Sequence, residues 1–255
     1  MMNTGLRAAL LVLLISGVVP AQDAQVHVLC SNGFRAALQK LLPEAQRTIG
    51  HPINVKFGTS ASFKQAIEGG EAFDLVIVTP QIIGDLIKDG KIAAGTQVDL
   101  ASTGVGMGVR AGQPKPDVSS AQAMKQTLLQ FKSIGIVKVG AGTPAVVDML
   151  SHLGITDQVQ PKIVYQEGAE QSMANLSSGK IEAAFGLISE IASVPGVQFV
   201  GPLPAEFQRK ILMTAGIASA AKNRKAAEGI IQSFTSAAAA ETIKAAGLEP
   251  IANGK

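Results

Sequence analysis

Short apolar runs alternate along the chain with longer segments in which apolar residues recur every three or four positions. The runs at 26–30, 53–57 and 74–78 have the length and the residue types of buried β-strands. Helical spacing follows each of these runs, at 33–49, 62–68 and 80–90. Strands that alternate with helices form parallel sheets through right-handed crossovers, so this half of the chain predicts an α/β fold.

The second half of the chain repeats this alternation less regularly. We expect extended segments at 98–110, 134–139, 162–165, 183–188, 197–200 and 211–219. We expect helices at 119–131, 144–153 and 169–177, followed by two alanine-rich helices near the end. Tyr165, the only tyrosine, falls in one of the predicted strands, where a core position is expected.

The first 21 residues have the pattern of a cleavable secretory signal. Arg7 supplies a positive charge, residues 8–19 are apolar, and small residues precede a predicted cleavage point after Ala21. The apolar run is shorter than the roughly 20 residues that a membrane helix needs. Cys30 lies inside a strand-like run, where a small buried side chain is expected, and not at a lipoprotein cleavage site. The sequence therefore predicts a freely soluble, exported protein of the periplasm.

Charge and composition exclude several classes of partner. Removal of 21 of the 255 residues leaves 234 with a net charge of +2, because Arg7 is the only charge lost from +3. A chain with this balance and no basic stripe is not expected to bind nucleic acid. One cysteine cannot form an internal disulfide, and the three histidines lack the spacing of a metal site. Gly140–Ala145 fits the dinucleotide fingerprint, but Pro144 interrupts its turn, so no cofactor is expected.

Polar residues follow the predicted strands at the points where open α/β sheets bind ligands. They form five segments, namely Ser31–Gly33, Gly58–Ser62, Thr79–Pro80, Gly140–Ala145 and Glu167–Ser172. Hydroxyls and backbone N–H groups of this kind can donate hydrogen bonds to an oxyanion without a buried positive charge. Helix capping is the commonest role of such residues taken singly, so both roles stay open for each segment.

Several longer motifs occur in order along the chain. They are SNGF at 31–34, FGTSASF at 57–63, FDLVIVTPQII at 73–83, VGAGTPA at 139–145 and EGAEQS at 167–172. In their order and spacing the chain resembles the periplasmic molybdate-binding proteins of ABC transporters, which have the type II periplasmic binding protein fold. The resemblance implies an α/β fold of two lobes, each a mostly parallel sheet flanked by helices, with the ligand cleft between them. It places lobe I at 22–105 and 213–255 and lobe II at 106–212.

The same resemblance implies which residues hold the ligand. Ser31 and Ser60 match two serines that donate to a tetrahedral oxyanion, and Ala145 and Ala169 match backbone donors of the other lobe. Leu187 stands near the position of a family tyrosine, and a leucine cannot donate a hydrogen bond. The candidate ligand-binding residues are Ser31, Asn32, Thr59, Ser60, Thr79, Arg110, Thr143, Ala145, Ala169, Gln171 and Ser172.

Two functions follow from the resemblance. The first is a monomeric periplasmic solute-binding protein that closes on a small oxyanion or carboxylate and delivers it to an ABC transporter permease in the inner membrane. That role needs no catalytic residue. The second is a periplasmic isomerase that shifts the double bond of a small tricarboxylate such as aconitate. Its general base would be Glu190 or Glu170, and Arg110 could hold a carboxylate.

Overall fold

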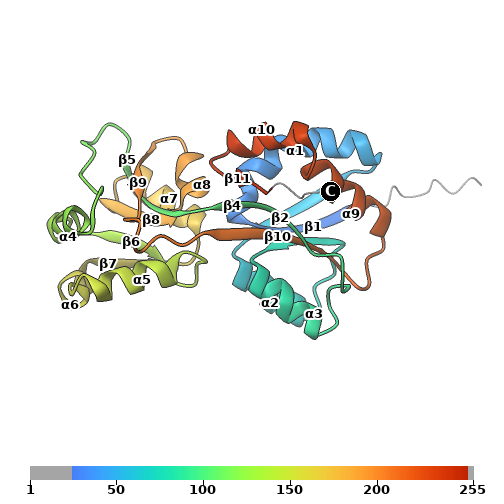
Figure 1. The fold of residues 1–255 in the computed structure, drawn as a ribbon, viewed down its shortest axis with the longest axis horizontal. Helices are drawn as coiled ribbons and strands as arrows, with labels where there is room; N and C mark the ends of the chain where they lie inside the picture. The colour runs from blue at the N-terminus through green and yellow to red at the C-terminus, as the bar shows by residue number, and fades with distance from the viewer. Residues whose placement is uncertain (1–24, 252–255) are drawn as a thin grey trace, which may run out of the picture.

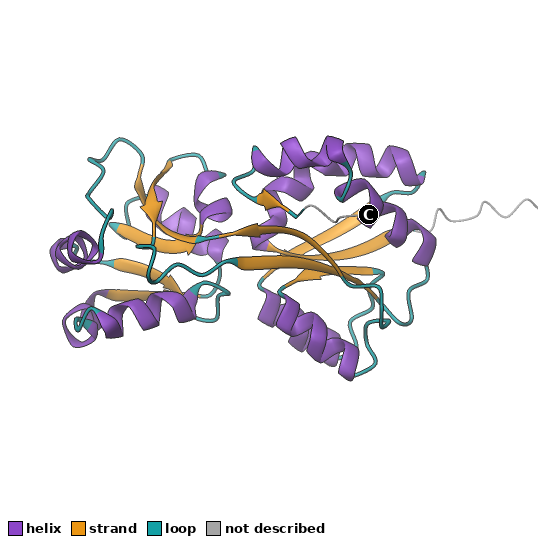
Figure 2. Ribbon diagram, in the orientation of Figure 1, coloured by secondary structure: helices purple, strands orange, loops and turns teal. Residues whose placement is uncertain are grey.

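Residues 25–251 are described by the computed structural model, in which two β-sheets lie side by side along the long axis, each with its own helices (Figures 1 and 2). The predicted signal peptide, 1–21, lies outside the described residues. The strands of the first sheet are β1 (Val26–Ser31), β2 (Ile53–Gly58), β3 (Leu75–Val78), β4 (Val98–Thr103), β10 (Ile211–Ile217) and β11 (Glu249–Pro250). The strands of the second sheet are β5 (Val105–Arg110), β6 (Ile134–Val137), β7 (Ile163–Gln166), β8 (Ala183–Leu187) and β9 (Val197–Pro202).

The helices divide between the two sheets, and we call each sheet with its helices a lobe. Lobe I carries α1 (Asn32–Ile49), α2 (Ser60–Glu68), α3 (Pro80–Lys88), α9 (Arg224–Phe234) and α10 (Ala237–Lys244). Lobe II carries α4 (Ala121–Gln130), α5 (Thr143–His152), α6 (Thr156–Val159), the short 3-10 helix Gln160–Lys162, α7 (Ala169–Ser177) and α8 (Ile188–Ala192). The two-lobe α/β fold expected from the sequence is confirmed.

Both sheets are mixed, and most strands of each run in one direction, as we expected. The strand orders are β11-β4-β10-β3-β1-β2 and β7-β6-β8-β5-β9. In the first sheet β1 pairs in parallel with β2 and β3, as the alternation of strands and helices predicts. In the second sheet β6 pairs in parallel with β7 and β8. Every antiparallel pair contains β5, β10 or β11, because these strands run against the other strands of their sheets.

Two segments carry the chain from one lobe to the other. The segment 98–110, expected as an extended stretch broken by glycine, is divided at Gly104 into β4 of the first sheet and β5 of the second. The Gly104 carbonyl accepts a hydrogen bond from the Ile188 N–H group at 2.9 Å, which ties this crossing to the start of α8. The chain returns between β9 and β10, and α9 and α10 then pack on α1 (Figure 1).

The core follows the apolar pattern of the sequence. All four residues of β3 are completely buried, and the rings of Phe34 in α1 and Phe234 in α9 lie 5.9 Å apart. Cys30 is fully buried as expected, and burial raises the pKa of its thiol far above the ordinary value. The expectation for Tyr165 is wrong, because its side chain is 53% exposed. It lies on β7, an edge strand that has a neighbour on one side only.

Asp74 fastens the C-terminal part of the chain to the first strands of lobe I. Its carboxylate accepts hydrogen bonds from the backbone N–H groups of His27 and Asn223, both at 2.9 Å, and from the Asn223 amide at 3.2 Å. Burial by itself raises the pKa of Asp74, but these donors outweigh it and hold the pKa below the ordinary value. The charged form of Asp74 therefore stabilises the fold.

We predict that Asp74→Asn lowers the free energy of unfolding by roughly 2–3 kcal/mol near neutral pH, since it removes a charged acceptor from buried donors. The pKa is lower in the folded state, so this advantage of the wild type is lost as pH falls through that pKa. Urea unfolding at about pH 7 and about pH 3 measures both effects. Asp157→Asn, at an exposed position, is the matched control and should change stability by less than about 0.5 kcal/mol. Equal losses for the two variants would contradict the prediction.

Candidate functional site

A cavity lies between the lobes, where the carboxyl ends of β1 and β2 face the loops of lobe II. Lobe I contributes Ser31, Thr59 and Ser60 to its wall. Lobe II contributes the turn 140–143, Ala169 at the start of α7, and the residues 185–187 and Glu190 around the end of β8. The enclosed volume is about 30 Å³, which is room for about two water molecules. The site is therefore narrow in this structure.

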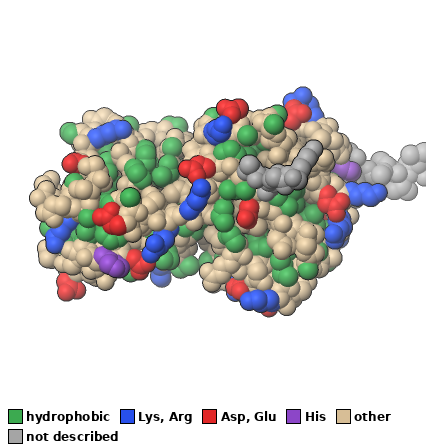
Figure 3. All heavy atoms as spheres, viewed as in Figure 1, with side chains coloured by type: hydrophobic (Ala, Val, Ile, Leu, Met, Phe, Trp, Pro, Cys, Tyr) green, Lys and Arg blue, Asp and Glu red, His purple; other side chains and the backbone are tan. Residues whose placement is uncertain are grey.

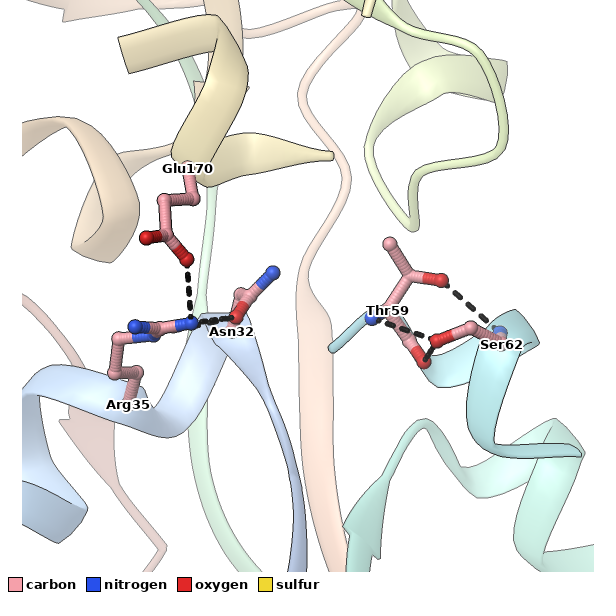
Figure 4. A network of polar contacts seen from close by, with 5 residues as sticks. All are labelled: Asn32, Arg35, Thr59, Ser62 and Glu170. Carbon is pink, nitrogen blue, oxygen red and sulfur yellow. Dashed lines mark hydrogen bonds and ion pairs between the residues drawn. The ribbon is translucent and has the colours of Figure 1, made fainter. Parts of the chain in front are cut away.

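Lobe I presents two serine hydroxyls to the cavity. Ser31 begins α1 without using its side chain as a cap, and Ser60 is the first residue of α2. The capping of α2 is done by Thr59, whose side chain forms a reciprocal pair of hydrogen bonds with Ser62 (Figure 4). The Ser60 Oγ atom is buried and has no hydrogen-bond partner. A dry, unpaired hydroxyl costs about 1–3 kcal/mol, so this atom favours a ligand or a water molecule.

Lobe II presents mainly backbone to the cavity. The Thr143 hydroxyl donates to the Val137 carbonyl at 2.6 Å and accepts from the Gly140 N–H group at 3.3 Å, so it holds the turn and is not free for a ligand. A Cβ atom at Gly142 would lie 3.0 Å from Val105, so the turn packs closely against β5. The start of α7 is fixed in the same way, because the Gln171 side chain accepts from the Glu167 N–H group at 2.9 Å.

The structure brings together only part of the predicted set. The cavity wall contains Ser31, Thr59, Ser60, Thr143 and Ala169. Thr79 lines a separate hollow beside Ser60, and Asn32 lines one beside Ala169. Ala145 is buried in α5 but is not part of the cavity wall.

Three predicted residues have other surroundings. Gln171 holds its own loop, and Ser172 is fully buried with an unpaired hydroxyl that lies close to Gly135 of β6. Arg110 is at the far end of β5, roughly 17 Å along the strand from Val105 in the cavity wall. It lies beside Gly179 in another hollow and cannot contact a ligand in the cavity.

Glu190 is the one acidic residue of the cavity wall within the described part of the chain. It lies in α8, directly after β8, and its Oε2 atom accepts from the Leu187 N–H group at 3.1 Å. Burial raises the pKa of Glu190 to about 7, although the Leu187 N–H group and the Arg35 charge act in the opposite direction. Its carboxyl group can therefore gain or lose a proton near neutral pH.

Arg35 is a residue that sequence reasoning missed. It lies one turn into α1, and its guanidinium donates to Asn32 Oδ1 at 2.9 and 3.3 Å and stacks on Phe57 at 4.4 Å from the ring centroid. It also forms an ion pair with Glu170 of lobe II at 3.2 Å (Figure 4). Arg35 is on a helix and not in one of the loops that follow the strands, where ligand residues were expected. The spacing of three between Asn32 and Arg35 on a helix was the signal that could have found it.

Few charged side chains line the cavity. No lysine or arginine belongs to its wall in the described part of the chain, and its donors are hydroxyls and backbone N–H groups. On the face shown in Figure 3, charged side chains are scattered singly over both lobes and form no continuous basic stripe. Within 25–251, no group of three or more His, Cys, Asp or Glu residues could hold a metal ion. No helix in this range is long and apolar enough to cross a membrane.

Comparison with known proteins agrees with this architecture. Residues 26–249 match the model of a family described as bacterial extracellular solute-binding protein. An aconitate isomerase of a Pseudomonas species is 27% identical over 229 residues, which are 88% of this chain and 87% of that protein. The molybdate-binding protein ModA of Azotobacter vinelandii is 25% identical over 232 residues, 89% of this chain and 90% of that protein.

The solved periplasmic molybdate-binding protein of Azotobacter vinelandii superposes with a TM-score of 0.75 at 21% identity. The match covers 88% of this chain and 98% of that one. This likeness shows the fold and confirms the resemblance drawn from the sequence motifs. Since the family model spans most of the chain, the protein belongs to the bacterial extracellular solute-binding proteins.

Proposed function

We propose that this chain is a periplasmic solute-binding protein of an ABC transporter that closes its two lobes on a small anion. The observation that carries the proposal is the buried, unpaired Ser60 hydroxyl in a cavity to which both lobes contribute. A ligand that accepts hydrogen bonds from both lobes at once stabilises the closed state relative to the open one. Closure is then the signal that a permease in the inner membrane reads.

The donor set favours an anion over a neutral or cationic ligand. Serine hydroxyls and the backbone N–H groups of Ala141, Gly142 and Ala169 can point hydrogen atoms at oxygen acceptors, whereas the N–H groups of Gly140 and Thr143 donate within the turn. Hydrogen bonds to a charged acceptor are stronger than those between neutral groups, so an oxyanion gains most from such donors. The Leu187 side chain in the wall donates nothing, which leaves the class of oxyanion or carboxylate open.

The remaining features of the proposal follow from the family. The lobes would comprise 22–105 with 213–255 and 106–212, and the protein would act as a monomer after removal of the signal 1–21. Its relatives include the molybdate-binding protein ModA and a putative ABC transporter substrate-binding lipoprotein of Bacillus subtilis, which supports a permease partner.

A second function, isomerisation of a small tricarboxylate, is favoured by Glu190. A general base works best when its pKa lies near the working pH, and burial raises the pKa of Glu190 to about 7 at the cavity wall. The Ser60 hydroxyl and the nearby N–H groups would then stabilise the enolate-like intermediate. Glu170 is the weaker candidate for the base, because its side chain is 77% exposed and paired with Arg35. The similarity to an aconitate isomerase supports this alternative.

Ser60→Ala tests the proposed site. A thermal-shift panel of molybdate, tungstate, sulfate, phosphate, citrate and both aconitates first identifies a ligand of the wild type. We expect Ser60→Ala to weaken that ligand roughly 10- to 100-fold in titration calorimetry, because a hydrogen bond to a charged group is lost.

Ser172→Ala is the matched control for this experiment. The Ser172 hydroxyl is equally buried and unpaired but lies outside the cavity wall, so this variant should bind like the wild type. Unchanged affinity in Ser60→Ala would place the ligand elsewhere and refute the site.

Glu190→Gln tests the alternative function. If the chain interconverts cis- and trans-aconitate, the rate should rise as pH passes through about 7, where Glu190 loses its proton. The variant should then lose at least about 100-fold in rate while it still binds the ligand. Absence of turnover in the wild type would exclude the isomerase and leave the binding function.

The same variant has an expected effect on stability. The pKa of Glu190 is raised in the folded state, so its contribution to stability is complete below its ordinary pKa and is lost as pH rises to about 7. Glu190→Gln cannot ionise, so its melting temperature should exceed that of the wild type more at about pH 8 than at about pH 5. Parallel melting curves for the two proteins across this range would contradict the assignment.

A further inference from the structure

A hollow adjoins the cavity on the side of Arg35. It has a volume of about 140 Å³, against about 30 Å³ for the cavity itself. Ala169 and Glu190 belong to both walls, so the two spaces are adjacent. Arg35 and Glu170, one from each lobe, both line the hollow and form an ion pair at 3.2 Å (Figure 4). A ligand with two acidic groups could place one in each space.

Arg35 is already held in the orientation that an anion needs. The Asn32 side-chain oxygen accepts hydrogen bonds from two N–H groups of Arg35, and the Phe57 ring lies against one face of the guanidinium. Its side chain is 31% exposed, so one edge remains open to the hollow. A planar guanidinium fixed in this way matches a carboxylate with two parallel hydrogen bonds.

The present partner of Arg35 is replaceable. The Glu170 side chain is 77% exposed, and its carboxylate pairs with the Arg35 guanidinium through a single contact at 3.2 Å. An ion pair of this exposure contributes little to stability, so a ligand carboxylate can displace it. The Asn32 amide nitrogen points toward the gap between the lobes, where it can donate a further hydrogen bond (Figure 4).

We propose that this hollow is a second anionic subsite, in which Arg35 and Asn32 hold a further carboxylate of a ligand whose first acidic group occupies the cavity. The inference rests on the proposed function and narrows its ligand to small di- or tricarboxylates. Arg35 would then be the residue that makes the site bind di- and tricarboxylates more tightly than anions with one acidic group. In this arrangement Glu190, which lines both spaces, would lie beside the ligand.

Titration calorimetry with two classes of probe tests this subsite. Sulfate, molybdate and acetate each present a single anionic centre, whereas citrate, cis-aconitate and trans-aconitate each carry three carboxyl groups. We expect Arg35→Gln to weaken the tricarboxylates roughly 10- to 100-fold and to leave the single-group anions within about twofold. Arg35→Lys keeps the charge and should recover part of the loss. Ser60→Ala should weaken both classes.

Glu170→Gln separates a subsite from a simple latch between the lobes. A subsite loses a competitor for Arg35, so tricarboxylates should bind as tightly as in the wild type or more tightly. A latch would instead make Arg35→Gln and Glu170→Gln change the affinity of all probes alike, and that result would overturn the proposal. Arg224→Gln, at an exposed pair on α9, is the control and should change nothing.

The failures of the two proposals are distinguishable. Binding of single-group anions only, with sensitivity to Ser60→Ala, overturns the subsite and keeps the proposed function. Binding of tricarboxylates that does not change in Arg35→Gln also overturns the subsite. No binding of any of these anions to the wild type refutes both.

Discussion

Buried hydrogen-bond donors that face each other across the junction of two lobes need an acceptor, and the rest of the site is arranged around this need. The donors are a serine hydroxyl without a partner, a second serine that does not cap its helix, and backbone N–H groups from turns that their own side chains hold in place. Neither lobe can satisfy them alone. A small anion can do so, and its binding free energy then becomes the free energy that keeps the lobes together.

Electrostatics restrict which anion fits. Neutral donors hold the first acidic group without the desolvation of a full positive charge. The charged groups stand at the edge, with Arg35 open to the adjoining hollow and Glu190 between the two spaces. Because burial places the pKa of Glu190 near 7, its carboxyl group can donate to the ligand or accept a proton from it. The two proposed functions, transport and isomerisation, would use the same arrangement and would differ in whether the proton on Glu190 is transferred.

Several polar side chains of the loops hold the backbone in place, so few of them are free to contact a ligand. Thr59, Thr143 and Gln171 are polar residues of the loops, yet each uses its side chain to fix a turn or a helix start. This rigidity keeps the N–H groups of the loops in position, which is what recognition of an anion by backbone requires. In the proposed site these loop side chains fix the backbone, and the ligand would contact Ser31, Ser60 and backbone N–H groups.

The amino-acid sequence by itself determined the order of strands and helices, the buried strands β1 and β3, and the loops that form the cavity, because the apolar spacing and the turn residues that specify them are local. It also determined the family, through motifs in a fixed order. Only the tertiary structure decided which loop residues meet. Arg110 lies at the end of β5 that is remote from the cavity. Ser172 and Ala145 are buried away from the cavity wall. Arg35 reaches the adjoining hollow from a helix and not from a loop. The physical reason is that the cavity is made where two lobes touch. Which side chains face each other there depends on strand register and on the two chain crossings. Neither the register nor the crossings can be inferred from the residues of a single segment.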